Sequence, residues 1–133
     1  MKTKIMIVDD EPDVVHSLKT ILEKEQYDVI TASNGFECIK KIEQGFQGII
    51  LLDFKMPEMN GLDTVKEIIK RDFAKDVAIE IISALGSNEN KRMGKLEPYI
   101  YDYLSKPIDI KELINSVKKC NAYLYAKRKK EDY

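Results

Sequence analysis

Short apolar runs alternate along the chain with longer stretches in which apolar residues recur at helical spacing. Two of the runs, Lys4–Val8 and Gly48–Leu52, show no polar alternation, which is typical of strands buried on both faces. Tyrosines stand at alternate positions around the last run, which indicates an edge strand. The predicted strands are Lys4–Val8, Tyr27–Ala32, Gly48–Leu52, Val77–Ile82 and Ile100–Leu104.

Helical patterns follow four of these strands. Pro12 suits the first turn of a helix, because its missing N–H leaves no hydrogen bond unmade there. Ser33 or Asn34 can cap the second helix, and Asp109 can cap the last one. The apolar faces carry Val14, Val15, Leu18, Ile21 and Leu22, then Phe36, Ile39 and Ile42, then Leu62, Val65, Ile68 and Ile69, and finally Ile110, Leu113, Ile114, Val117 and Leu124.

The stretch after the fourth strand, Ser87–Pro98, has the weakest pattern. Gly94 disfavours a helix and Pro98 interrupts one, so we expect a short or mobile fourth helix. Five successive β–α units predict an α/β fold with a parallel sheet. Right-handed crossovers then limit the topology to a doubly wound, flavodoxin-like five-stranded parallel sheet with helices on both faces.

The length and the charge of the chain limit the number of domains and the classes of partner that it can have. Its 133 residues support one domain, predicted over residues 1–122. Residues 123–133 are predicted to be a basic extension of the last helix or a tail. The 22 Lys and Arg residues against 23 Asp and Glu residues leave a formal net charge of -1, so the overall charge favours neither nucleic acid nor an anionic membrane.

Signals for export, membrane insertion and metal-binding cysteines are absent from the sequence. No apolar run approaches the length of a membrane span, and the N-terminus lacks the core of a signal peptide. Cys38 and Cys120 have neither metal-site spacing nor a disulfide framework, so they are predicted to be packing residues. We therefore expect a cytoplasmic protein.

Polar side chains stand at the ends of four predicted strands. They are Asp9 and Asp10 after the first strand, Asp53 after the third, Ser83 after the fourth and Lys106 after the fifth. Because the carboxyl ends of parallel strands meet at one edge of the sheet, we expect these side chains to lie together. Each one alone has an ordinary explanation, such as helix capping or a surface ion pair. Their joint position favours a functional site.

Crowded carboxylates repel one another and need a cation. Mg²⁺ prefers hard oxygen ligands, usually one or two carboxylates completed by water and phosphate oxygens. Asp10, Asp53 and a backbone carbonyl near Lys55 could supply such a site, with Asp9 reaching the ion through water. Mn²⁺ would suit the same oxygens.

The same residues suit phosphoryl transfer. An aspartate can be a nucleophile toward phosphorus, and the transfer depends mainly on positioning and charge neutralisation. Mg²⁺ and Lys106 would neutralise the phosphoryl oxygens, and the Ser83 hydroxyl could donate to another. Ala84 is small and leaves room for the incoming group.

These residues together resemble the receiver domain of response regulators in two-component signalling, over about residues 3–122. The resemblance implies that Asp53 accepts a phosphoryl group from a phosphohistidine on a sensor histidine kinase or a histidine phosphotransfer protein. The implied Mg²⁺ ligands are Asp9, Asp10, Asp53 and the backbone carbonyl of Lys55. The matching motifs are Val-Asp-Asp-Glu-Pro at 8–12, Asp-Phe-Lys-Met-Pro at 53–57 with Gly61 beyond, Ser83-Ala84, and Tyr-Leu-Ser-Lys-Pro at 103–107.

The resemblance also implies a switch. Ser83 and the backbone of Ala84 would bind the phosphoryl group, and Lys106 would pair with it. Tyr103 matches the aromatic switch residue, and the bond before Pro107 is expected to be cis. The fourth helix, fifth strand and fifth helix would form an output face for an unknown protein target, in a monomer or a phosphorylation-dependent dimer. Direct contact with nucleic acid or membrane is not expected.

We interpret the chain as a stand-alone receiver, with a piece of a longer regulator as the alternative. We do not expect an enzyme, apart from self-phosphorylation by small donors and self-dephosphorylation. Three features depart from the family pattern: Phe54, the stretch Lys91–Tyr101, and the 23 positions from Ser83 to Lys106, about one more than is typical. They leave the output surface, and so the partner, unidentified. One alternative is a receiver-like module that binds its partner constitutively. Another is a Mg²⁺-dependent phosphatase with an aspartyl-phosphate intermediate, but Lys55 stands where such enzymes usually carry a second aspartate.

Overall fold

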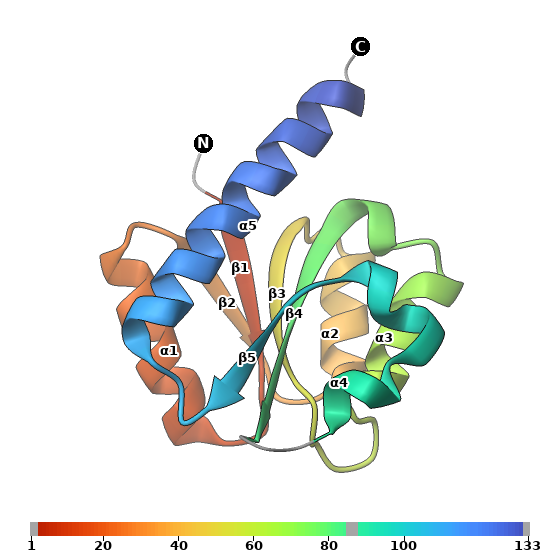
Figure 1. Ribbon diagram of the computed structural model, residues 1–133, viewed down its shortest axis with the longest axis horizontal. Coiled ribbons are helices and arrows are strands. Elements are labelled where there is room, and N and C mark those ends of the chain that lie inside the picture. Colours follow the sequence, from red (N-terminus) through yellow and green to blue (C-terminus); the bar gives the residue numbers. More distant parts are fainter. Residues whose placement is uncertain (1–2, 85–87, 132–133) are drawn as a thin grey trace.

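The computed structural model describes residues 3–84 and 88–131. Its centre is a parallel five-stranded sheet with the strand order β2-β1-β3-β4-β5 (Figure 1). This confirms the predicted fold class, and it confirms that the last strand lies at an edge. The strands are β1 (Lys4–Val8), β2 (Asp28–Ala32), β3 (Gly48–Asp53), β4 (Val77–Ala84) and β5 (Ile100–Lys106).

Three strands run further than their apolar patterns predict. The pattern placed the ends of β3, β4 and β5 before Asp53, Ser83 and Lys106, but the structure includes these residues in the strands. The backbone pairing continues through them, with Asp53 opposite Ile82 and Ser83 opposite Ser105. A strand ladder is made by backbone groups, so polar side chains do not end it. The other difference is small, since β2 begins at Asp28 and not at Tyr27.

Helices cover both faces of the sheet. In Figure 1, α1 and α5 lie on one face, whereas α2 and α3 lie on the other. The end of α5 projects beyond the body of the molecule. The helices are α1 (Pro12–Lys24), α2 (Gly35–Glu43), α3 (Gly61–Lys70), α4 (Glu89–Arg92) and α5 (Ile110–Glu131), with short 3₁₀ turns η1 (Ala74–Asp76) and η2 (Gly94–Tyr99).

Side-chain caps begin three of these helices. The side chain of Asn34 accepts a hydrogen bond from the backbone N–H of Glu37 at 2.8 Å, so Asn34 caps α2 and Ser33 does not. Asn60 caps α3 in the same way. The carboxylate of Asp109 accepts from the N–H of Glu112 at 3.0 Å, as the sequence predicted for the last helix.

The fourth helix is short, as predicted. It consists of Glu89–Arg92, and η2 follows it with Pro98 inside. The buried side chain of Met93 joins these two segments to the core. Ser87, where the weak stretch begins, lies outside the described residues.

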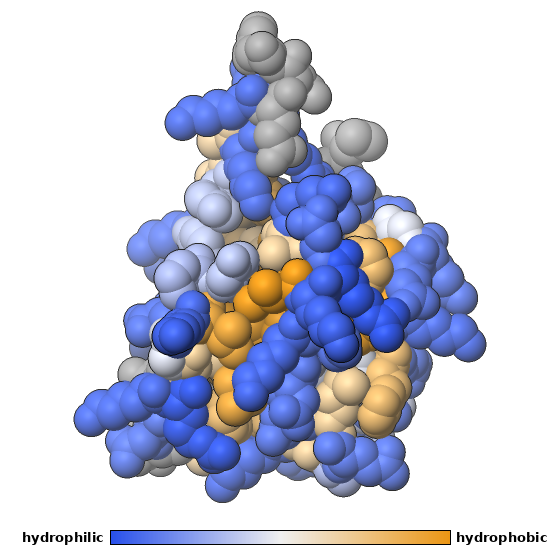
Figure 2. All heavy atoms as spheres, turned by 90° about the vertical axis from the view of Figure 1, so that its right-hand side faces the viewer, coloured by the Kyte–Doolittle hydropathy of each residue, from blue (hydrophilic) through white to orange (hydrophobic). Residues whose placement is uncertain are grey.

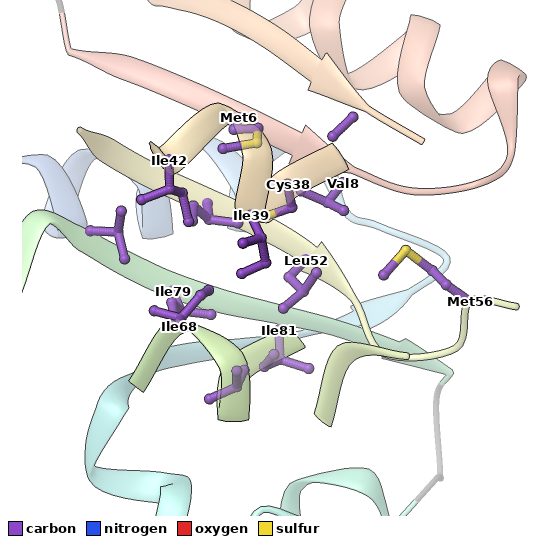
Figure 3. Close-up of a cluster of buried hydrophobic side chains, with 14 of the residues drawn as sticks. Met6, Val8, Cys38, Ile39, Ile42, Leu52, Met56, Ile68, Ile79 and Ile81 are labelled. Carbon is purple, nitrogen blue, oxygen red and sulfur yellow. The ribbon is translucent and has the colours of Figure 1, made fainter. Parts of the chain in front are cut away.

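The sheet separates two apolar clusters. One packs β1, β3 and β4 against α2 and α3, and Figure 3 shows labelled members such as Ile39, Leu52 and Ile68. The other packs the opposite face against α1 and α5. Cys38 lies in the first cluster and Cys120 in the second; both are buried free thiols, as predicted. Every residue of β3 is buried, which explains its unbroken apolar pattern.

One side of the molecule is shown in Figure 2, the side that is on the right in Figure 1. Hydrophilic residues there surround a smaller area of apolar residues. Within the described ranges, none of the helices combines the length and the apolar character that a membrane crossing requires.

Candidate functional site

Three carboxylates meet at the carboxyl edge of the sheet. Asp53 is the last residue of β3, and Asp9 follows β1, where its N–H donates to the carbonyl of Ala32 at 3.1 Å. One carboxylate oxygen from each of Asp9, Asp10 and Asp53 lies within 4.8 Å of the others. Asp9 and Asp53 are buried and Asp10 is exposed, so the group opens to solvent on one side. The structure thus brings together the three carboxylates that the sequence predicted.

Lys106 reaches this group from the end of β5. Its Nζ lies 3.3 Å from Asp9 Oδ2, 3.5 Å from Asp53 Oδ2 and 3.6 Å from Glu11 Oε1. Glu11 was not among the predicted site residues, but the structure places it against Lys106. The local reason is a hydrogen bond from the Glu11 N–H to Asp9 Oδ1 at 2.9 Å, which turns the chain back toward the strand ends.

The carboxylates outnumber the cation, and this affects their protonation. Burial raises the pKa of Asp53 to about 6, and the neighbouring charge of Asp9 adds to the rise. The Lys106 ammonium and the backbone N–H of Lys55 oppose that rise in pKa. Burial alone would lower the pKa of Lys106, but the carboxylates around it outweigh burial and hold that pKa above its usual value.

The donor set fits a hard divalent cation. Asp53 is 4% exposed, yet it shares its surroundings with a second buried carboxylate. Three carboxylates against the single ammonium of Lys106 leave a net negative charge on these four side chains. Carboxylate oxygens are the ligands that Mg²⁺ prefers, and the exposed side at Asp10 leaves room for water.

The predicted switch residues lie around the same edge. Ser83 is half-buried and pairs across the sheet with Ser105, while Ala84 pairs with Lys106. Tyr103 packs against the α2–α3 cluster, and within the described residues its buried hydroxyl has no hydrogen-bond partner. The peptide bond from Lys106 to Pro107 is cis.

Phe54, which departs from the family pattern, connects the site to α4. Phe54 is 1% exposed, and its N–H donates to the carbonyl of Ile82 at 2.8 Å. The guanidinium of Arg92 lies 5.2 Å from the centre of the ring. An aromatic side chain at this position therefore fills the space between the strand ends and α4.

Residues 5–118 match the family model of the response regulator receiver domain. The chain belongs to this family. It is 37% identical, over 87% of its length, to a CpxR homologue from Haemophilus influenzae named as a transcriptional regulatory protein, and it covers 49% of that relative. It is 29% identical to the protein PilH of Pseudomonas aeruginosa, covering 93% of that chain and 86% of its own. The chain thus spans about half the length of the curated transcriptional regulators that it matches.

Solved structures agree with this assignment. A CheY-like receiver domain from Methanospirillum hungatei superposes with a TM-score of 0.86 at 34% identity, covering 92% of this chain and 97% of that one. The response regulator TrrA of Thermotoga maritima, solved with Mg²⁺ and beryllofluoride, has a TM-score of 0.76 at 32% identity over 90% of this chain and 99% of that one. The receiver fold predicted from the sequence is therefore confirmed.

Proposed function

We propose that this receiver domain is a phosphorylation-activated switch in which Asp53 accepts a phosphoryl group from a sensor histidine kinase or a histidine phosphotransfer protein. One observation carries the proposal: Asp9, Asp10 and Asp53 converge at an opening of the sheet edge, and Lys106 touches two of them. The arrangement offers a nucleophilic oxygen, a fixed cation and oxygen ligands for a metal.

The transfer step needs little movement of the protein. An Asp53 carboxylate oxygen attacks the phosphorus, the bond from phosphorus to the histidine nitrogen breaks, and the imidazole takes up a proton. Asp9, Asp10, Asp53 and the backbone carbonyl of Lys55 would hold Mg²⁺, which neutralises phosphoryl oxygens when it is bound. Lys106, already 3.5 Å from Asp53, would pair with the phosphoryl group.

The switch follows from the new charge. A phosphoryl group on Asp53 would draw the Ser83 hydroxyl and the backbone N–H of Ala84 toward it. Tyr103 lies on β5 beside these residues, so α4, β5 and α5 would form the face that changes. We propose that this face binds a protein target in the cytoplasm, as a monomer or a phosphorylation-dependent dimer, without direct contact with nucleic acid. The chain would act as a signalling protein and not as an enzyme.

Intact-mass spectrometry after incubation with acetyl phosphate and Mg²⁺ tests the proposal. We expect a single phosphoryl adduct that does not form when EDTA removes the metal. Beryllofluoride binding, followed by NMR, covers the case of an adduct that hydrolyses quickly. If neither an adduct nor beryllofluoride binding were found, the switch would be ruled out and constitutive binding would become the favoured function.

Metal binding is expected to depend on pH. Because the pKa of Asp53 is raised to about 6, its carboxyl is partly protonated below that pH and must lose a proton to bind Mg²⁺. We expect Mg²⁺ affinity, measured by calorimetry, to fall by about tenfold for each pH unit below the pKa. An affinity that stays constant from pH 7 to pH 5 would contradict a role for Asp53 as a ligand.

A further inference from the structure

A second acidic group lies on the other side of the sheet from α2 and α3. Glu80 stands in the middle of β4 and is 0% exposed, within a run of Val, Ala and Ile residues. Its side chain faces α5, where it contacts Ser116, which is also buried. Fully buried glutamates are rare unless they are paired, so this residue requires an explanation.

An irregularity in the sheet supplies Glu80 with an acidic neighbour. The register between β4 and β5 shifts after Ile79, which pairs with Ile100, so that Glu80 pairs with Asp102. Tyr101 is left without a partner, as in a β-bulge. A bulge re-aims the side chains that follow it, and here it sets Asp102 beside Glu80.

One hydroxyl joins the two acids. Ser116 Oγ is in hydrogen-bond contact with Glu80 Oε1, and it lies 2.7 Å from Asp102 Oδ2. A hydroxyl has one proton to donate, so it cannot donate to both carboxylates at once. If both contacts are hydrogen bonds, one carboxyl group must carry a proton and donate it to Ser116.

None of the ion pairs found among the described residues involves Glu80 or Asp102. Burial, the Ser116 hydrogen bond and the charge of Asp102 shift the pKa of Glu80, and no cation is among these causes. The other Glu80 oxygen, Oε2, is buried without a hydrogen-bond partner. The titratable groups nearby are Tyr101 of β5 and Cys120 of α5, and burial raises the pKa of both, which keeps them neutral.

We propose that Glu80, Asp102 and Ser116 form a proton-binding site that stabilises the packing of α5 against β4 and β5. Glu80 holds the proton and donates it to Ser116 Oγ, and Ser116 donates its own proton to Asp102. The site joins three elements that far-apart parts of the sequence supply. It lies on the opposite side of the sheet from α3 and does not depend on phosphorylation, so it goes beyond the function proposed above.

The site makes the attachment of α5 sensitive to pH. Burial raises the pKa of Glu80 to about 7; the Ser116 hydrogen bond lowers it and the charge of Asp102 raises it further. Since the usual value is 4.5, the protonated site contributes stability that is complete below that pH. The contribution is lost as the pH rises through about 7, when two carboxylates would share one hydroxyl proton.

A carbon-detected NMR titration of the Glu80 side-chain carboxyl tests proton binding directly in the unmodified chain. We expect a midpoint near pH 7, with a linked response of the Ser116 and Asp102 signals. A midpoint near 4.5, the ordinary value, would overturn the proposal. Because this measurement needs no variant and no phosphoryl donor, its failure and the failure of the Asp53 proposal are separate results.

A variant tests the effect on α5. Glu80→Gln keeps the shape of the protonated acid and can donate to Ser116, but it does not titrate. We expect the folding equilibrium constant of the wild type to fall relative to that of Glu80→Gln by on the order of 50-fold between pH 5 and pH 8. Glu112→Gln, which alters an exposed glutamate of the same helix, is the matched control and should show no such divergence.

Labelling of the two buried thiols shows whether the α5 side or the α2 side of the sheet becomes exposed. Cys120 lies on α5 and Cys38 on α2, so the ratio of their labelling rates removes the common effect of pH on thiol chemistry. We expect the ratio of Cys120 to Cys38 labelling to rise with pH in the wild type and to stay level in Glu80→Gln. A ratio that is independent of pH in both proteins would show that the site does not hold α5.

Discussion

Asp53→Asn is expected to abolish the phosphoryl adduct formed with acetyl phosphate and Mg²⁺. The amide nitrogen and oxygen of asparagine are too weakly nucleophilic to attack phosphorus, and the side chain also loses one anionic metal ligand. Asp63→Asn, on the exposed surface of α3, is the matched control and should be phosphorylated like the wild type. An adduct on the Asp53→Asn variant would mean that another residue is the acceptor.

The same substitution is expected to stabilise the fold. Burial and the charge of Asp9 raise the pKa of Asp53 to about 6, so the ionised carboxylate is unfavourable in the folded state at neutral pH. That penalty is absent below the usual pKa of 3.8 and is complete above pH 6. Asparagine removes it, and we expect about 1–3 kcal/mol of added stability at pH 7 without metal.

Urea unfolding at two pH values measures this gain. The Asp53→Asn variant and the wild type should differ clearly at pH 7 and converge near pH 4, where the aspartate is largely protonated. Saturating Mg²⁺ should reduce the difference, because the ion stabilises only the protein that retains all its ligands. A variant that is less stable than the wild type at pH 7 would contradict the view that the ionised Asp53 carboxylate destabilises the folded state.

Gly48→Ala is expected to be the most damaging of the small substitutions. Gly48 begins β3 with a φ of +151°, and a Cβ there would lie 2.1 Å from the backbone carbonyl oxygen of Lys4 on β1. That backbone is paired in the sheet and cannot move aside cheaply. Strain and overpacking together predict a loss of about 3–5 kcal/mol, a large part of the stability of an ordinary domain.

Gly45→Ala separates the two causes of that loss. Gly45 also has a positive φ, +107°, but a Cβ on it would meet nothing within 4 Å. This variant should therefore show the cost of the backbone conformation alone, about 1–2 kcal/mol. The midpoints of urea unfolding give the stability loss of each variant, provided that the slope of the unfolding free energy against urea concentration is unchanged. Equal losses in the two variants would show that the contact with Lys4 is unimportant.

The order of the elements and the acidic edge could be predicted from the sequence. Apolar runs without alternation, such as Lys4–Val8, require burial on both faces, and only a parallel sheet covered by helices provides it. Once the strands are parallel, the residues that follow them meet at one edge. The convergence of Asp9, Asp53 and Lys106 was therefore predictable without coordinates.

Contacts that depend on exact register could not be predicted. Glu11 lies in a turn whose direction is set by its hydrogen bond to Asp9, and no periodicity encodes that direction. The contact between Arg92 and Phe54 depends on where a helix of four residues docks. In both cases the partner is chosen by the packing of elements that are distant in the sequence.

The site at Glu80 shows most clearly what tertiary structure decides. In the sequence, Glu80 is one acidic residue inside an apolar run, and Asp102 is one among alternating tyrosines. The register shift after Ile79 and the position of Ser116 on α5 bring these groups together. The sequence by itself therefore determined the fold class and the acidic edge, because these follow from local periodicity and the parallel sheet. Only the tertiary structure decided which buried acids share a hydroxyl, because one residue of register changes the face and the neighbour of every side chain after it.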